Sequence, residues 1–94
     1  MRVKWLRTAL TNLDEIADFI AQDNSKAAHQ VVAHIYKQVE ILADQPALGR
    51  LGRIHGTREL VIGGLPFIIP YRVRGGKVEI LRVLHSARQW PKKF

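Results

Sequence analysis

The stretch that decides the fold is TRELVIGGLPFIIPYRVRGGKVEILRVLHSARQW, residues 57–90. It contains three apolar runs that are separated by Gly-Gly pairs at residues 63–64 and 75–76. Double glycines supply the positive φ angles that tight hairpin turns require, so the stretch predicts an antiparallel meander. The predicted strands are 57–62, 66–73 and 77–85. Because proline cannot donate a hydrogen bond to a neighbouring strand, Pro70 predicts a local break in pairing.

Two amphipathic helices precede the meander, after a short strand at residues 2–6. Apolar residues recur at helical spacing in both segments, with Thr8 and Ser25 at the expected N-cap positions. Pro46 ends the second helix, because the residue before a proline avoids helical dihedral angles. The pattern predicts an α+β domain of order β-α-α-β-β-β, in which a helix hairpin packs on one face of a small, twisted, mainly antiparallel sheet.

Length and charge limit the functions that the chain can have. The 94 residues form one domain, 1–94, with 15 Lys and Arg against 8 Asp and Glu, a formal charge of +7 and no cysteine. A strong positive charge favours a polyanionic partner such as nucleic acid, a ribosome or an acidic polypeptide. The lack of cysteine excludes disulfides, thiolate metal sites and thiol nucleophiles. No apolar run is long enough to span a membrane and no secretory signal is present, so we expect a cytoplasmic protein with no membrane partner.

Acidic and histidine side chains do not form a metal-binding pattern. Asp14 and Asp18 lie one helical turn apart, but no histidine accompanies them at ligand spacing. His29 and His34 are five residues apart and do not share a helix face. We therefore expect no metal and no cofactor.

A glycine-rich basic loop follows the second helix. Residues 48–56 read LGRLGRIHG and include Arg50 and Arg53, with Arg58 just beyond. Glycine lets the backbone approach a ligand, and the arginine fork matches phosphate oxygens. The spacing matches neither the P-loop nor the dinucleotide fingerprint. We interpret the loop as a phosphate- or target-binding surface; the alternative is a flexible, solvated loop.

Five segments occur together in one order along nearly the whole chain. They are LDEIADFIAQDN (13–24), ADQPALGR (43–50), GTREL (56–60), YRV (71–73) and VEILRVLH (78–85). In this combination the chain resembles the RelE/ParE superfamily of toxins from bacterial type II toxin–antitoxin modules. The resemblance implies a small basic growth inhibitor, of the kind linked to plasmid stabilization, that is encoded beside an antitoxin whose C-terminal segment wraps and neutralises it.

The superfamily contains two mechanisms, and the resemblance leaves both open. RelE-like members are mRNA interferases that cut ribosome-bound mRNA without metal, and in that case Arg58 and His85 match catalytic positions. The middle-strand arginine of those nucleases is replaced here by Ile68, and their C-terminal tyrosine is absent. ParE-like members share the fold, lack the catalytic set and poison DNA gyrase, which the replacements slightly favour. A non-toxic nucleic-acid-binding module is the third alternative.

The expected partners follow from the charge and the resemblance. The candidate target- or phosphate-binding residues are Arg50, Arg53, Arg58, Arg82, Arg88 and Trp90. We expect the antitoxin to bring an acidic segment with apolar anchors that folds as it binds, giving a hetero-oligomer. It should cover the apolar outer flank of the helix hairpin and the arginines of the basic loop. The C-terminal tail, 86–94, is either ordered or docks only on a target.

Overall fold

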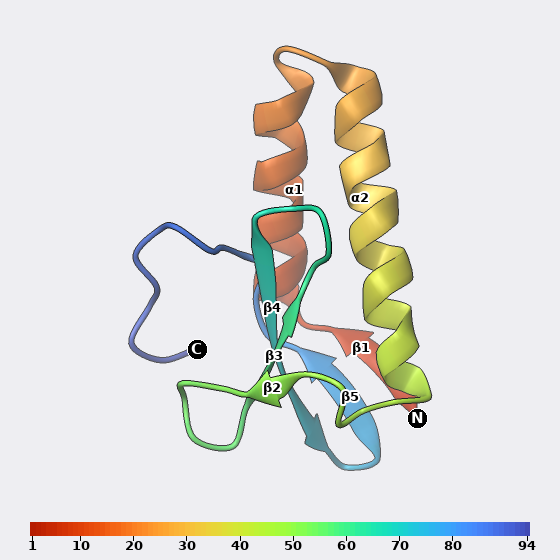
Figure 1. The fold of residues 1–94 in the computed structure, drawn as a ribbon, viewed down its shortest axis with the longest axis vertical. Coiled ribbons are helices and arrows are strands. Elements are labelled where there is room, and N and C mark those ends of the chain that lie inside the picture. Colours follow the sequence, from red (N-terminus) through yellow and green to blue (C-terminus); the bar gives the residue numbers. More distant parts are fainter.

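Two helices cover one face of a six-stranded sheet in the computed structural model, which describes residues 1–94 (Figure 1). The elements in chain order are β1 (Arg2–Trp5), α1 (Arg7–Ala21), α2 (Ser25–Glu40), a 3-10 helix (Ile41–Ala43), β2 (Arg50–Leu51), β3 (Arg58–Val61), β4 (Phe67–Arg74), β5 (Lys77–Ile80) and β6 (Leu84–His85). The strand order is β1-β5-β4-β3-β2, and β6 pairs with β4. Only β1 and β5 run parallel. The predicted α+β architecture is confirmed; the short strand β2 was not expected, and the predicted strand 77–85 is divided into β5 and β6.

The helix ends differ from the sequence prediction. Helix α1 begins one residue before Thr8, and its N-cap, Leu6, makes no side-chain hydrogen bond. Asn24 and not Ser25 caps α2, because its Oδ1 accepts a hydrogen bond from the backbone N–H of Ala27 at 3.0 Å. Both residues of the Asn-Ser pair are good caps, and Asn24 has the extended backbone of an N-cap while Ser25 is already helical. Helix α2 also ends before Pro46, and a 3-10 turn leads from it into the loop.

The meander forms around the expected turns, but its last strand is interrupted. Gly75 and Gly76 have φ angles of 60° and 71°, as a two-residue β4–β5 hairpin turn requires. Beyond β5, residues 81–83 leave the ladder before β6 resumes it. The interruption lies beside Pro70, whose carbonyl still accepts a hydrogen bond from the Leu81 N–H at 2.9 Å. Strand β4 itself continues through the proline, because its other edge pairs with β3. The predicted break in pairing is therefore confirmed at one edge of β4, where residues 69 and 70 have no partner strand, while the opposite edge stays paired with β3.

The core lies between the sheet and the helices. Along β4 the residues at 67, 69 and 71 are buried, as are the β5 residues 78 and 80 that share this face. Ile35 and Val39 of α2 meet them with no exposed surface. The outer half of the hairpin extends beyond the sheet (Figure 1). Neither helix is long and apolar enough to cross a membrane.

Tyr71 joins the core to the start of the basic loop. Its side chain is fully buried, and its hydroxyl accepts a hydrogen bond from the Gly49 N–H and donates one to the Pro46 carbonyl, both at 2.8 Å. A Cβ added at Gly49 would lie 2.6 Å from the Tyr71 ring, so only glycine fits there. The hydroxyl therefore fixes where the chain enters the basic loop.

We expect Tyr71→Phe to lower the free energy of unfolding by about 1–3 kcal/mol, because a buried N–H and a buried carbonyl lose their partner. Chemical denaturation measures the change. Tyr36→Phe is the control, since Tyr36 is partly exposed and only its ring packs, against Trp5. Equal stability of the two variants would contradict the assigned role.

Candidate functional site

The arginines in and just beyond the basic loop lie on two faces of the sheet. Arg58 and Glu59 are neighbours on β3, so their side chains point to opposite sides. Arg50 pairs with Glu59 and shares the face turned away from the helices. Arg58 pairs with Tyr71 and lies on the helix side. Arg58 therefore does not join Arg50 and Arg53 in one binding surface.

Glu59 organises the basic loop. It is 3% exposed, and its Oε1 accepts hydrogen bonds from Arg50 Nε and Nη2 at 3.2 and 3.1 Å. Its Oε2 accepts from the backbone N–H and Nε of Arg53 at 3.0 and 3.2 Å. Burial by itself raises the pKa of Glu59, but these hydrogen bonds and the arginine charges outweigh it, so the pKa is lowered from its ordinary value of 4.5. One carboxylate is thus shared by two guanidinium groups, which leaves one positive charge in a loop held in a fixed shape.

The C-terminal tail connects to the same loop. The Arg53 guanidinium carbon lies 3.4 Å from the centre of the Trp90 ring, a cation–π contact. The Trp90 indole N–H donates to the His85 carbonyl at 3.2 Å. Of the predicted target-binding residues, Arg50, Arg53 and Trp90 are therefore brought together.

The two candidate catalytic residues do not converge. Arg58 Nη1 donates to the Gly49 carbonyl at 2.8 Å, and so helps to fix the loop. His85 stands edge-on to Phe67, with ring centres 5.7 Å apart, and its Nδ1 accepts the Ala87 N–H at 3.1 Å. Arg58 pairs with residue 71 of β4 and His85 with residue 67, so they are about 13 Å apart along the strand. Arg58 and His85 cannot contact one phosphate group in this arrangement.

The remaining candidates lie near the C-terminal segment. Arg82 is half-buried in the interruption between β5 and β6, and Arg88 is exposed at the edge of a groove. Ile68, at the position where the nucleases carry arginine, is buried and pairs with Val61. No group of three or more His, Cys, Asp or Glu side chains has the arrangement of a metal site.

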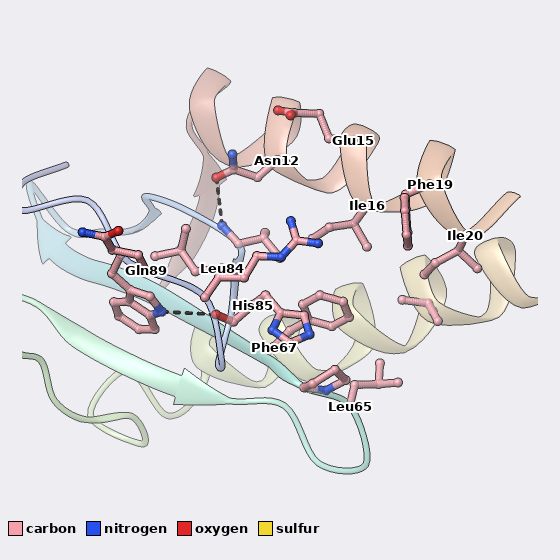
Figure 2. A pocket seen from close by; sticks show the side chains of 15 residues that line it. Asn12, Glu15, Ile16, Phe19, Ile20, Leu65, Phe67, Leu84, His85 and Gln89 are labelled. Carbon is pink, nitrogen blue, oxygen red and sulfur yellow. Dashed lines mark hydrogen bonds between the residues drawn. The ribbon is translucent and has the colours of Figure 1, made fainter. Parts of the chain in front are cut away.

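An apolar groove of about 640 Å³ lies between α1 and the C-terminal segment. Figure 2 shows Phe19 and Ile20 of α1 on one side, and Leu65, Phe67 and His85 on the other. Phe19 is 66% exposed although it is aromatic. The groove was not predicted from the sequence, because Phe19 lies outside the apolar stripe from which α1 was predicted. A large apolar residue beside that stripe was the available signal.

We expect Glu59→Gln to lower the free energy of unfolding by about 1–2 kcal/mol at neutral pH, because Arg50 and Arg53 lose a charged acceptor. The lowered pKa means that the contribution of the Glu59 charge is present above pH 4.5 and is lost as the pH falls through the folded-state pKa. Denaturation at several pH values should show the difference from the unsubstituted protein shrinking in acid. Glu40→Gln, at an exposed position without an ion pair, should have little effect at any pH.

Comparisons with known proteins agree with this fold. The profile of the family described as "ParE toxin of type II toxin-antitoxin system, parDE" matches residues 3–90. The putative toxin Y4kP of Sinorhizobium fredii is 51% identical over 90 residues, which cover 96% of this chain and 93% of that protein. Toxin RelE2 of Caulobacter vibrioides is 37% identical over 87 residues, which cover 93% of this chain and 97% of that toxin.

A solved structure of the chromosomal ParDE toxin–antitoxin system from P. aeruginosa matches with a TM-score of 0.82 and 33% identity, over 90% of this chain and 95% of that one. The profile match and the two toxins agree with the resemblance noted in the sequence. The chain therefore belongs to the ParE toxin family, within the RelE/ParE superfamily of type II toxin–antitoxin systems.

Proposed function

We propose that the protein inhibits growth in the bacterial cytoplasm by binding DNA gyrase. The observation that carries the proposal is the separation of Arg58 from His85. Metal-free RNA cleavage needs a base, a cation and an acid around one phosphate. Here the Arg58 guanidinium is bound to a backbone carbonyl, and Ile68 provides no charge at the middle-strand position. Binding to gyrase breaks no bond and therefore needs no base, cation and acid around one phosphate.

A ribosome-dependent mRNA endonuclease is the second candidate. His85 is only partly buried and lines the groove together with Arg88, so a titratable ring and a cation share one end of the groove. Cleavage by this pair would require an RNA phosphate at the C-terminal segment and would not involve Arg58. Brief induction with parallel readouts of the DNA damage response and of transcript ends separates the two mechanisms.

We expect the double variant Arg58→Ala, His85→Ala to keep most of its toxicity in a growth assay after induction, because neither side chain performs chemistry in the gyrase mechanism. Loss of a general acid or base lowers a reaction rate by about 10²–10⁴-fold. A decrease of that size, together with loss of A-site cleavage, would establish the nuclease. Since Arg58 also fixes the loop, binding of the antitoxin to the variant serves as the folding control.

We further propose that the groove beside α1 receives an apolar segment of the cognate antitoxin. The projecting hairpin leaves this side without cover from the chain itself, and Phe19 is the most exposed aromatic residue in it. A segment that folds on binding buries such a surface through side chains at helical spacing. The outer flank of the hairpin, with Ala17, Ala21 and Ala28, is a smaller hollow of about 360 Å³ and is the second surface for the same partner.

Phe19→Glu should weaken the antitoxin complex by at least tenfold, because a charge would be buried in an apolar contact. Titration calorimetry or a competition assay measures the affinity. Val61→Glu is the matched control: Val61 is also exposed and apolar but lies on β3, outside both hollows and outside the basic loop. Unchanged affinity for Phe19→Glu would place the antitoxin elsewhere.

A further inference from the structure

Charge is segregated between the two layers of the molecule. Residues 7–44, which form the helix layer, contain three basic and six acidic side chains. The rest of the chain contains twelve basic side chains and only two acidic ones, Glu59 and Glu79. The excess positive charge therefore belongs to the sheet and its loops.

Three of these cations form a row across adjacent strands. Arg74 of β4 pairs with Lys77 of β5, and Lys77 pairs with Arg2 of β1. Residues that pair across strands point to the same face, and the row between Lys77 and Glu79 contains Val78, which is fully buried in the core. The cationic row, Arg2–Lys77–Arg74, thus lies on the face turned away from the helices.

The row is hardly neutralised by the protein. Glu79 lies two residues beyond Lys77 on β5 and points to the same face. Its carboxylate accepts a hydrogen bond from Arg72 Nε at 2.7 Å and lies 3.3 Å from Arg74 Nε. Arg2 and Lys77 form no ion pair. One carboxylate therefore serves two arginines, and the other two members of the row have none.

This arrangement costs stability. Like charges directly opposite each other on paired strands are destabilising. The register cannot shift to relieve them, because the Gly75-Gly76 turn has the positive φ angles of a fixed two-residue hairpin. An unfavourable set of charges that is held in register indicates a binding function.

We propose that the cationic row binds the phosphodiester backbone of a nucleic acid. Arginine and lysine contact phosphates without reading the sequence, and each contact releases counterions. An acidic peptide is less suited to this surface, because peptide segments need apolar pockets for affinity and the neighbouring residues on this face, Lys4, Glu79 and Arg72, are charged. The row lies at the β4–β5 turn, at the end of the molecule farthest from the α1–α2 connection (Figure 1).

The proposed site is separate from the loop and groove described above. It involves neither the Arg50–Arg53–Glu59 cluster nor Arg58 or His85. The inference goes beyond the proposed function and does not rest on it, since binding to purified nucleic acid is measured without gyrase, ribosome or antitoxin. Loss of binding and loss of toxicity are therefore distinguishable results.

The test compares two double variants that remove the same charge. Arg2→Gln, Lys77→Gln removes two cations from the row, and Lys26→Gln, Lys37→Gln removes two exposed cations from α2. Fluorescence anisotropy of the purified full-length proteins, with labelled duplex DNA, single-stranded DNA and RNA at several salt concentrations, gives the affinity and its salt slope. The nucleic acid that binds most tightly identifies which of the three phosphodiester backbones the row prefers.

For the row variant we expect about tenfold weaker binding near 0.1 M salt, and for duplex DNA a salt slope smaller by about two units, one for each lost phosphate contact. The α2 variant should keep the original slope. The row variant should also have a higher midpoint of thermal unfolding, because it removes like-charge repulsion. If Arg2 and Lys77 instead stabilised the fold, the row variant would have a lower midpoint of thermal unfolding.

Two results would overturn the proposal. One is an equal loss of affinity in both variants, which would indicate a response to net charge alone. The other is tight binding of polyglutamate, but of none of the three nucleic acids, with the same dependence on Arg2 and Lys77. That result would assign the row to an acidic polypeptide.

Discussion

The strict alternation of side chains along β4 is the constraint on which the rest of the structure depends. This strand of eight residues pairs with β3, β5 and β6, so its register determines which side each neighbouring residue faces. Positions 67, 69 and 71 pack under the helices, while 72 and 74 carry arginines on the other side. A shift of one residue would bury those arginines. The register of β4 therefore determines both the packing of the core and the position of the cationic surface.

Two nearly buried carboxylates fix the positions of the arginines on the face of the sheet turned away from the helices. Glu59 holds arginines from the basic loop, and Glu79 holds Arg72 and Arg74. Removal of a carboxylate from water is costly, and paired guanidinium groups roughly offset that cost. Their main effect is thus on orientation, since each fixes side chains that are otherwise mobile. The arginines are presented to a partner in a defined geometry with little loss of side-chain entropy on binding.

The sequence predicted those features that a local interaction decides. The glycine pairs placed the turns, and the apolar periodicity placed both helices. Prediction failed where residues distant in sequence compete. The break in pairing at Pro70 was predicted, but not that it falls on one edge only, because β3 supports the other edge of β4. Whether Arg58 joins Arg50 and Arg53 depends on which of residues 58 and 59 faces the helices. The positions of charged residues in the sequence do not show which one does. The role of Glu59 follows only once that face is known.

The groove and the basic loop are coupled through one side chain. Trp90 lines the groove and also stacks on Arg53, whose guanidinium and backbone N–H are bound to Glu59. Displacement of Trp90 from this position would break the cation–π contact with Arg53 and leave Glu59 as the remaining side-chain partner of Arg53. The tail has few other contacts, so this change disturbs little of the core. The C-terminal segment thus connects the wall of the groove to the charged surface of the basic loop.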